Sequence, residues 1–273
     1  MEKYNKKKLL ISFLPLVITF IIYYIAYFAA FFMTFITGGS TTAASDGLFV
    51  NEGFFNIIRF MILLIIFAVW YKYRFYDLYK KEENTIITKK KIVMILFSLI
   101  ITGVLLQLFV SAVLSILMSH FPDFFKSYNE IIDSFKGSKP SYLTIFSVII
   151  LAPIAEELIF RGVTFCYQIE AVGTKAAIIF QAIAFGLYHL NLVQGTYAFF
   201  TGLLLGAVCY RYKNLLPAII LHMAVNASSF FIPASFYQGQ KKCTAIIFLS
   251  GASLIFFIYY SCRSKAISIR PSK

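Results

Sequence analysis

Two adjacent glutamates lie in the middle of a long apolar stretch of this sequence, where a carboxylate is costly. The chain has 12 acidic residues, but only Glu156 and Glu157 fall deep inside such a stretch. Two of its three histidines, His189 and His222, also fall in apolar stretches. An ionisable side chain in a membrane-type span is a functional candidate by default. Carboxylates and imidazoles are the groups that move protons in hydrolytic chemistry.

The spacing around the glutamates gives them different expected roles. On a helix, Glu157 and Arg161 are four residues apart with the acid first, which is the favoured order for an ion pair. Glu156 points about 100° away around the helix and has no local cation, which suits a general base. The structural alternative is that both carboxylates share Arg161 and hold neighbouring helices together.

The two histidines each have a partner one helical turn away. Phe185 precedes His189 by four residues, and Asn226 follows His222 by four. Taken singly, His189 could be a core or interface residue, and His222 with Asn226 could form hydrogen bonds between helices. Together with Glu156 they supply a carboxylate, two imidazoles and an amide, which is an inventory for hydrolysis.

The composition predicts that a lipid bilayer surrounds the elements that carry these residues. Of 273 residues, 60% are hydrophobic and only 14% charged, whereas soluble domains average about 25% charged residues. The net charge of +13 comes from basic residues that flank apolar runs, as in Lys6–Lys8 and Lys89–Lys91. This arrangement favours membrane-flanking charge and argues against nucleic acid as a partner.

Eight apolar segments are near the length of about 20 residues that spans a bilayer. We predict an all-α, polytopic integral membrane protein with about eight transmembrane helices. The segments are residues 9–36, 54–71, 92–119, 142–169, 175–190, 196–211, 215–232 and 243–262. We treat the chain as one membrane domain: residues 1–141 hold three spans without a motif, 142–232 the candidate site, and 233–273 the last span and a basic tail.

The distribution of Lys and Arg predicts the orientation. With both termini in the cytoplasm, the inner segments hold 16 basic residues and the outer segments five, and cytoplasmic loops carry the excess of positive charge. At about 1.5 Å per residue, His189 would lie about 21 Å along its helix from Lys175, and His222 about 10 Å from Leu215. The two imidazoles are therefore expected at different depths unless a helix tilts or breaks.

The motif residues resemble those of the CPBP family, which includes CAAX prenyl endopeptidases and bacteriocin-processing enzymes and is also called the Abi family of intramembrane proteases. The resemblance covers about residues 142–232. It rests on three motifs in this order: Glu156-Glu157-x-x-x-Arg161, Phe185-x-x-x-His189 and His222-x-x-x-Asn226.

The resemblance implies an intramembrane endopeptidase that acts on peptide or protein substrates, including membrane-associated ones. Glu156 matches the catalytic glutamate, and His189 matches the histidine that helps it activate water. His222 and Asn226 match the pair that stabilises the oxyanion. The supporting positions are Glu157, Arg161 and Phe185.

The residues leave two questions open, one about the cofactor and one about the function. Glu156, His189 and His222 could form a His₂Glu zinc site, but a metal-free mechanism uses the same residues and better explains Asn226 as an oxyanion donor. The chain could also be a non-catalytic membrane scaffold or regulator of the same family. A transporter or a bacteriocin immunity protein that uses the polar cluster as an ion path is the remaining alternative.

Overall fold

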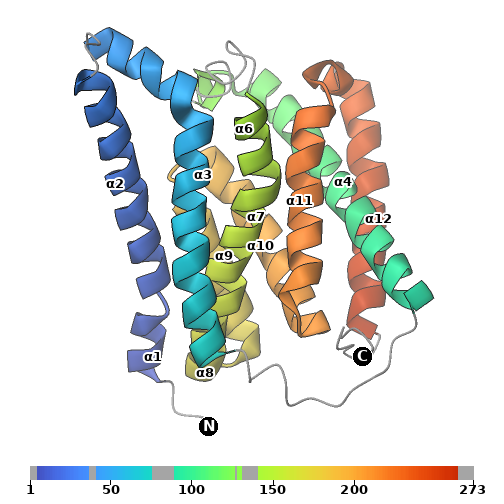
Figure 1. Ribbon diagram of the computed structural model, residues 1–273. Helices are drawn as coiled ribbons and strands as arrows, with labels where there is room; N and C mark the ends of the chain where they lie inside the picture. Colours follow the sequence, from blue (N-terminus) through green and yellow to red (C-terminus); the bar gives the residue numbers. More distant parts are fainter. Residues whose placement is uncertain (1–4, 37–40, 76–88, 127, 131–140, 264–273) are drawn as a thin grey trace. The chain divides into compact units, whose positions relative to one another are not determined.

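The computed structural model describes residues 5–36, 41–75, 89–126, 128–130 and 141–263, and helices dominate this part of the chain (Figure 1). The structure is 91% helical, and the described residues form no strand. The predicted all-α fold class is confirmed.

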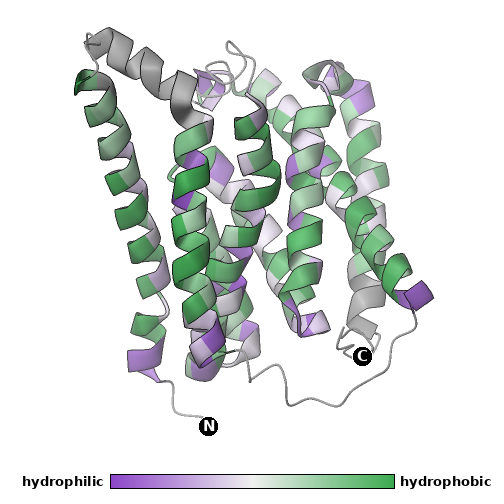
Figure 2. Cartoon of the chain, viewed as in Figure 1, coloured by the Kyte–Doolittle hydropathy of each residue, from purple (hydrophilic) through white to green (hydrophobic). Residues whose placement is uncertain are grey.

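Six of the described helices are long and apolar enough to cross a membrane, and the protein is a multi-pass membrane protein. They are Lys6–Met33, Gly53–Arg74, Lys89–His120, Tyr142–Val172, Leu192–Tyr212 and Gln240–Phe257. Figure 2 shows that hydrophobic residues cover most of their length. Two further apolar helices, Thr174–Tyr188 and Leu215–Phe231, have 15 and 17 residues, fewer than the roughly 20 of a full span. The number of complete crossings stays a prediction.

The chain divides into two compact units, each described here by itself. Unit 1 contains Met1–Tyr76 and Ser138–Phe180, and unit 2 contains Asp77–Gly137 and Gln181–Lys273.

Unit 1 is built around α3, which packs against α2 and against the long fourth span (Figure 1). Close approach is possible at Gly53, where a Cβ would lie 2.8 Å from the backbone nitrogen of Thr144; a residue without a side chain lets two helix backbones approach. The elements are α1 (Lys6–Ile11), α2 (Leu14–Ile36), α3 (Thr41–Arg74), α6 (Tyr142–Phe146), η1 (Ser147–Leu151), α7 (Ala152–Glu157), η2 (Leu158–Thr164) and α8 (Phe165–Val172).

Charged residues gather at one end of unit 1. The Nζ of Lys8 and the Nη2 of Arg74 lie 2.8 and 3.2 Å from Oε2 of Glu170. The backbone N–H of Asn5 donates to the carbonyl of Ala171 at 3.1 Å. The start of the first span and the ends of the second and fourth therefore share one end of the unit, as spans that alternate in direction require.

Unit 2 is built around α4, which packs against both α11 and α12. A Cβ at Gly103 of α4 would lie 2.7 Å from the carbonyl oxygen of Leu221 and from the Cβ of Ala224, so the α4 and α11 backbones are in close contact. The elements are α4 (Lys89–His120), most of α9 (Thr174–Tyr188), α10 (Leu192–Tyr212), α11 (Leu215–Phe231), η3 (Ala234–Tyr237) and α12 (Gln240–Arg263).

The charge distribution predicts that both termini face the cytoplasm. A topology reporter fused after residue 45 should therefore be external, and the same reporter fused after residue 81 should be cytoplasmic, because residues 72–91 hold seven basic residues. Enzymatic activity of the reporters in whole cells measures both positions. A cytoplasmic signal from the fusion after residue 45 would contradict the predicted orientation.

Candidate active site

The two glutamates end a short α-helix that is enclosed by wider turns of π-helix. Segment η1 precedes α7 and η2 follows it, and Glu156 and Glu157 are the last two residues of α7. Pro153 lies in the first turn of α7 and has no backbone N–H to donate to the preceding turn, which gives a local reason for irregular hydrogen bonding there. Segments of π-helix are rare and occur frequently at functional sites.

Glu157 and Arg161 form the ion pair that their spacing predicts. The Nη1 of Arg161 donates to Oε1 of Glu157 at 2.9 Å, and both side chains are completely buried. Glu156 is also buried, with 6% of its surface exposed. The carboxylate of Glu157 is therefore engaged by a guanidinium on its own helix, and the adjacent carboxylate of Glu156 is a separate buried acid.

His189 lies in the turn after α9 rather than within the helix. The helix ends at Tyr188, and the half-buried His189 follows it. Leu190 has φ of 52°, a left-handed conformation that non-glycine residues rarely adopt. The next helix, α10, begins immediately afterwards, capped by the side chain of Asn191, which accepts from the backbone N–H of Gln194 at 2.9 Å. A short, strained connection therefore presents this imidazole.

Both imidazoles of the motif set flank the ring of Phe185. The ring centroid of Phe185 lies 5.2 Å from that of His189 and 5.7 Å from that of His222, and both contacts are edge-to-face. The helical rise along each segment predicts imidazoles at different depths, yet the two rings contact the same phenyl group. The two imidazoles therefore lie close to one ring despite their different positions along their helices.

Small residues hold this aromatic cluster in place. A Cβ at Gly202 of α10 would lie 3.2 Å from the ring of Phe185, so α10 contacts α9 at this ring. Gly103 brings α4 against the turn of α11 that carries the buried His222. Asn226 is half-buried one helical turn after His222. Close packing of backbones therefore determines where His222 lies.

The structure brings the motif residues together in two groups. Unit 1 holds Glu156, Glu157 and Arg161, and unit 2 holds Phe185, His189, His222 and Asn226. Among the described residues, no three His, Cys, Asp or Glu side chains are grouped so that they could hold a metal ion. Each group is one part of the candidate site: a carboxylate part and an imidazole part.

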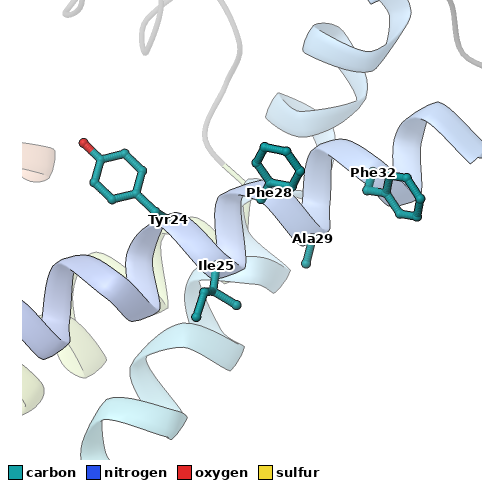
Figure 3. Close-up of a pocket in the computed structure, with 5 residues that line it drawn as sticks. All are labelled: Tyr24, Ile25, Phe28, Ala29 and Phe32. Atoms are coloured by element: carbon teal, nitrogen blue, oxygen red, sulfur yellow. The ribbon is translucent and has the colours of Figure 1, made fainter.

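Two apolar hollows are lined by other residues. One lies on α2 alone and is lined by Tyr24, Ile25, Phe28, Ala29 and Phe32 (Figure 3). The other, of about 480 Å³, is lined mainly by side chains of α4 and α10. Neither is lined by a carboxylate or an imidazole, so the candidate site rests on the motif residues.

Three further residues were not identified from the sequence. Gly103 contacts the helix of His222, and nothing marks it among the other residues of its apolar run. Thr164 and Gln168 are completely buried in the fourth span. Their positions, three and seven residues after Arg161, are a signal that could have indicated a shared helix face.

The family model described as type II CAAX prenyl endopeptidase Rce1-like matches residues 138–228. The match covers about a third of the chain, and this region is similar to the Rce1-like family. No curated protein and no solved structure matches the chain. The matched region includes every motif residue from Glu156 to Asn226, and so both the carboxylate part and the imidazole part. The match agrees with the resemblance of the three motifs to CAAX-type membrane proteases.

The buried ion pair predicts a large cost for removing one partner. Glu157→Gln should lower the free energy of unfolding by about 3–5 kcal/mol, because it leaves the Arg161 charge without the carboxylate that neutralises it. Thermal unfolding of the purified protein in detergent measures the loss. Glu170→Gln is the matched control, since its partners Lys8 and Arg74 are exposed and such pairs contribute at most about 1 kcal/mol. Equal losses in the two variants would contradict the role of Glu157.

Proposed function

We propose that this protein is an intramembrane endopeptidase that hydrolyses a peptide bond with water activated by Glu156. The observation that carries the proposal is the complete motif set within the Rce1-like match, in which one glutamate is ion-paired and its neighbour is a second buried acid. The substrate is a peptide or protein that reaches the site from the membrane or its surface. The roles that we propose for Glu156, His189, His222 and Asn226 follow from the positions that these residues occupy in the three motifs.

The ion pair assigns different roles to the two glutamates. The carboxylate of Glu157 accepts a charge-assisted hydrogen bond from Arg161 at its Oε1. An oxygen engaged in this way is less accessible to a water molecule. Glu156 matches the catalytic glutamate of the motif, so its carboxylate is proposed as the general base. Glu157 and Arg161 then act as support for the helix that presents Glu156.

The proposed reaction needs no covalent intermediate with the protein. Glu156 takes a proton from a water molecule held with the help of His189, while the water oxygen bonds to the peptide carbonyl carbon. The carbonyl π electrons move to oxygen, and the resulting oxyanion accepts hydrogen bonds from His222 and Asn226. When the carbon–nitrogen bond breaks, the carboxyl of Glu156 returns the proton to the leaving amine.

The aromatic cluster supports these roles for the histidines. The contacts of Phe185 with both imidazoles limit the orientations that the rings can take. Orientation matters because a hydrogen-bond donor stabilises an oxyanion only when it points at the position where the charge develops. Phe185 is therefore proposed to be a positioning residue.

A zinc ion is the alternative source of activated water. The donors fit zinc by type, because Glu156, His189 and His222 would form a His₂Glu set, and bound zinc would lower the pKa of a ligated water. We propose the metal-free mechanism because Asn226, one turn from His222 on α11, suits an oxyanion donor and is a poor zinc ligand.

Glu156→Gln should lower the cleavage rate by about 10²–10⁴-fold, because the amide keeps the shape of the side chain but cannot accept the proton of water. Cleavage of a peptide library by the purified protein, with products identified by mass spectrometry, measures the rate. Glu170→Gln should cleave at the wild-type rate. If Glu156→Gln turned over as fast as the wild type, Glu156 would not be the base.

The same assay tests whether the two parts act on one water molecule. If Glu156 and His189 activate it together, the double variant Glu156→Gln/His189→Ala should lose little more activity than the more damaging single variant, since residues that act as a unit are strongly non-additive. Additive losses would show that the two side chains act separately. Absence of cleavage by the wild type on any library would favour the scaffold alternative.

Variants at His222 and Asn226 separate the two mechanisms. Without a metal, Asn226→Ala should lower kcat by about 10²–10³-fold and leave measurable activity, because it removes one oxyanion donor. Asn226→Asp should lose more, since it places a negative charge where the oxyanion forms. Elemental analysis of the active wild type should find no stoichiometric zinc. One zinc per active chain, lost in His222→Ala, would instead establish the zinc mechanism.

A further inference from the structure

A stripe of buried polar side chains runs along the second half of the fourth span. Glu157, Arg161, Thr164 and Gln168 follow one another at intervals of three or four residues, and each is completely buried. The motif function uses only the first two. Elements α2 and α3 pack against η2, and α1 packs against α8, so other helices of unit 1 cover this half of the span.

The last two members of the stripe have no protein partner among the described residues. The Oγ1 of Thr164 and both amide atoms of Gln168 are buried and make no hydrogen bond. A buried polar atom that lacks a partner destabilises the folded state. Buried Thr102, by contrast, donates to the carbonyl of Ser98, and the amide nitrogen of Gln181 donates to that of Gly202, although the Oε1 of Gln181 accepts no hydrogen bond from the described residues. Thr164 and Gln168 differ from these two residues because every polar side-chain atom they carry is buried without a protein partner in the described part of the chain.

The position of the stripe indicates which ligand would satisfy these atoms. Eleven residues separate Glu157 from Gln168, which is about 16 Å along a helix. Two residues further on, Glu170 binds Lys8 and Arg74 at the charged end of unit 1. The stripe thus leads from the end of the span, where water is abundant, to the ion pair beside Glu156.

We propose that Thr164 and Gln168 bind a short file of buried water molecules that hydrates the Glu157–Arg161 pair from the charged end of unit 1. Water fits these groups because a hydroxyl and an amide both donate and accept, and a buried water makes about three hydrogen bonds to otherwise unsatisfied groups. The file would also deliver the water that is consumed in hydrolysis; this second role rests on the proposed peptidase function.

Radiolytic labelling tests the water file, because hydroxyl radicals formed from a bound water modify side chains next to it. The chain provides matched reporters, since Cys166 and Cys209 are both buried thiols outside any disulfide. Cys166 lies between Thr164 and Gln168 in the sequence, and its sulfur is 3.9 Å from the carbonyl oxygen of Arg161. In the wild type Cys166 should be labelled several-fold faster than Cys209.

Substitutions that remove the water ligands should remove the difference. Thr164→Val/Gln168→Met keeps the side-chain volumes, and its Cys166 should be labelled as slowly as Cys209. Thr164→Val alone, which replaces one hydroxyl by a methyl group, should give a partial decrease and serves if the double variant does not fold. Thr102→Val removes a satisfied buried hydroxyl elsewhere and should leave the labelling of Cys166 unchanged.

A dry interior would give the opposite results. Cys166 would be labelled no faster than Cys209 in the wild type, and the double variant would unfold at a higher temperature because two unsatisfied polar side chains had been removed. Either result overturns the water file. The labelling requires no turnover, so a positive result with a protein that cleaves no peptide would keep the water file and reject the peptidase.

Discussion

Glu157 and Arg161 form a completely buried ion pair inside a membrane span. The attraction between the two charges has to offset the free-energy cost of removing both of them from water. The pair lies on one helix, so the backbone fixes its geometry and folding of the span forms it directly. Its consequence reaches beyond stability. With one carboxylate engaged by the guanidinium, the neighbouring Glu156 can remain a distinct acid in the same buried turn. The division of labour proposed for the two glutamates depends on this single interaction.

The π-helical turns on both sides of α7 are the second element of this arrangement. A π turn holds more residues than an α turn and therefore changes the direction in which the following side chains point. Pro153 gives a local reason for irregular bonding before the glutamates. After them, η2 carries Arg161 and Thr164, and α8 carries Gln168. One span thus contains the ion pair, the candidate base and the polar stripe, and its irregular backbone determines how these groups are directed.

Much of the fold was predictable because it depends on the medium and on helix periodicity. Among the described residues, hydropathy located the six apolar helices that are long enough to span a membrane and the two shorter ones. The four-residue spacing identified the ion pair. The turn at His189 was not predictable, because ending α9 at Tyr188 requires Leu190 to adopt a left-handed conformation that its residue type disfavours. The shared contact of both imidazoles with Phe185 was also missed. It depends on the close approach of helices at Gly103 and Gly202. Such tertiary packing cannot be predicted from residue spacing along a single helix.

The polar groups of the two parts of the candidate site are stabilised in an apolar medium in different ways. In unit 1, charge neutralisation along one helix stabilises the carboxylate part. In unit 2, the imidazole part lies on or beside α9 and α11, the two shorter apolar helices, and small residues bring the neighbouring backbones into contact around it.

A helix of 15 residues, such as α9, is about 22 Å long, less than the roughly 30 Å of the hydrocarbon core. A helix of this length ends before it has crossed the hydrocarbon layer. Its last turn is then stabilised where it contacts protein rather than lipid. His189 follows such an end and lies against the ring of Phe185, so its imidazole has a protein side chain as its neighbour.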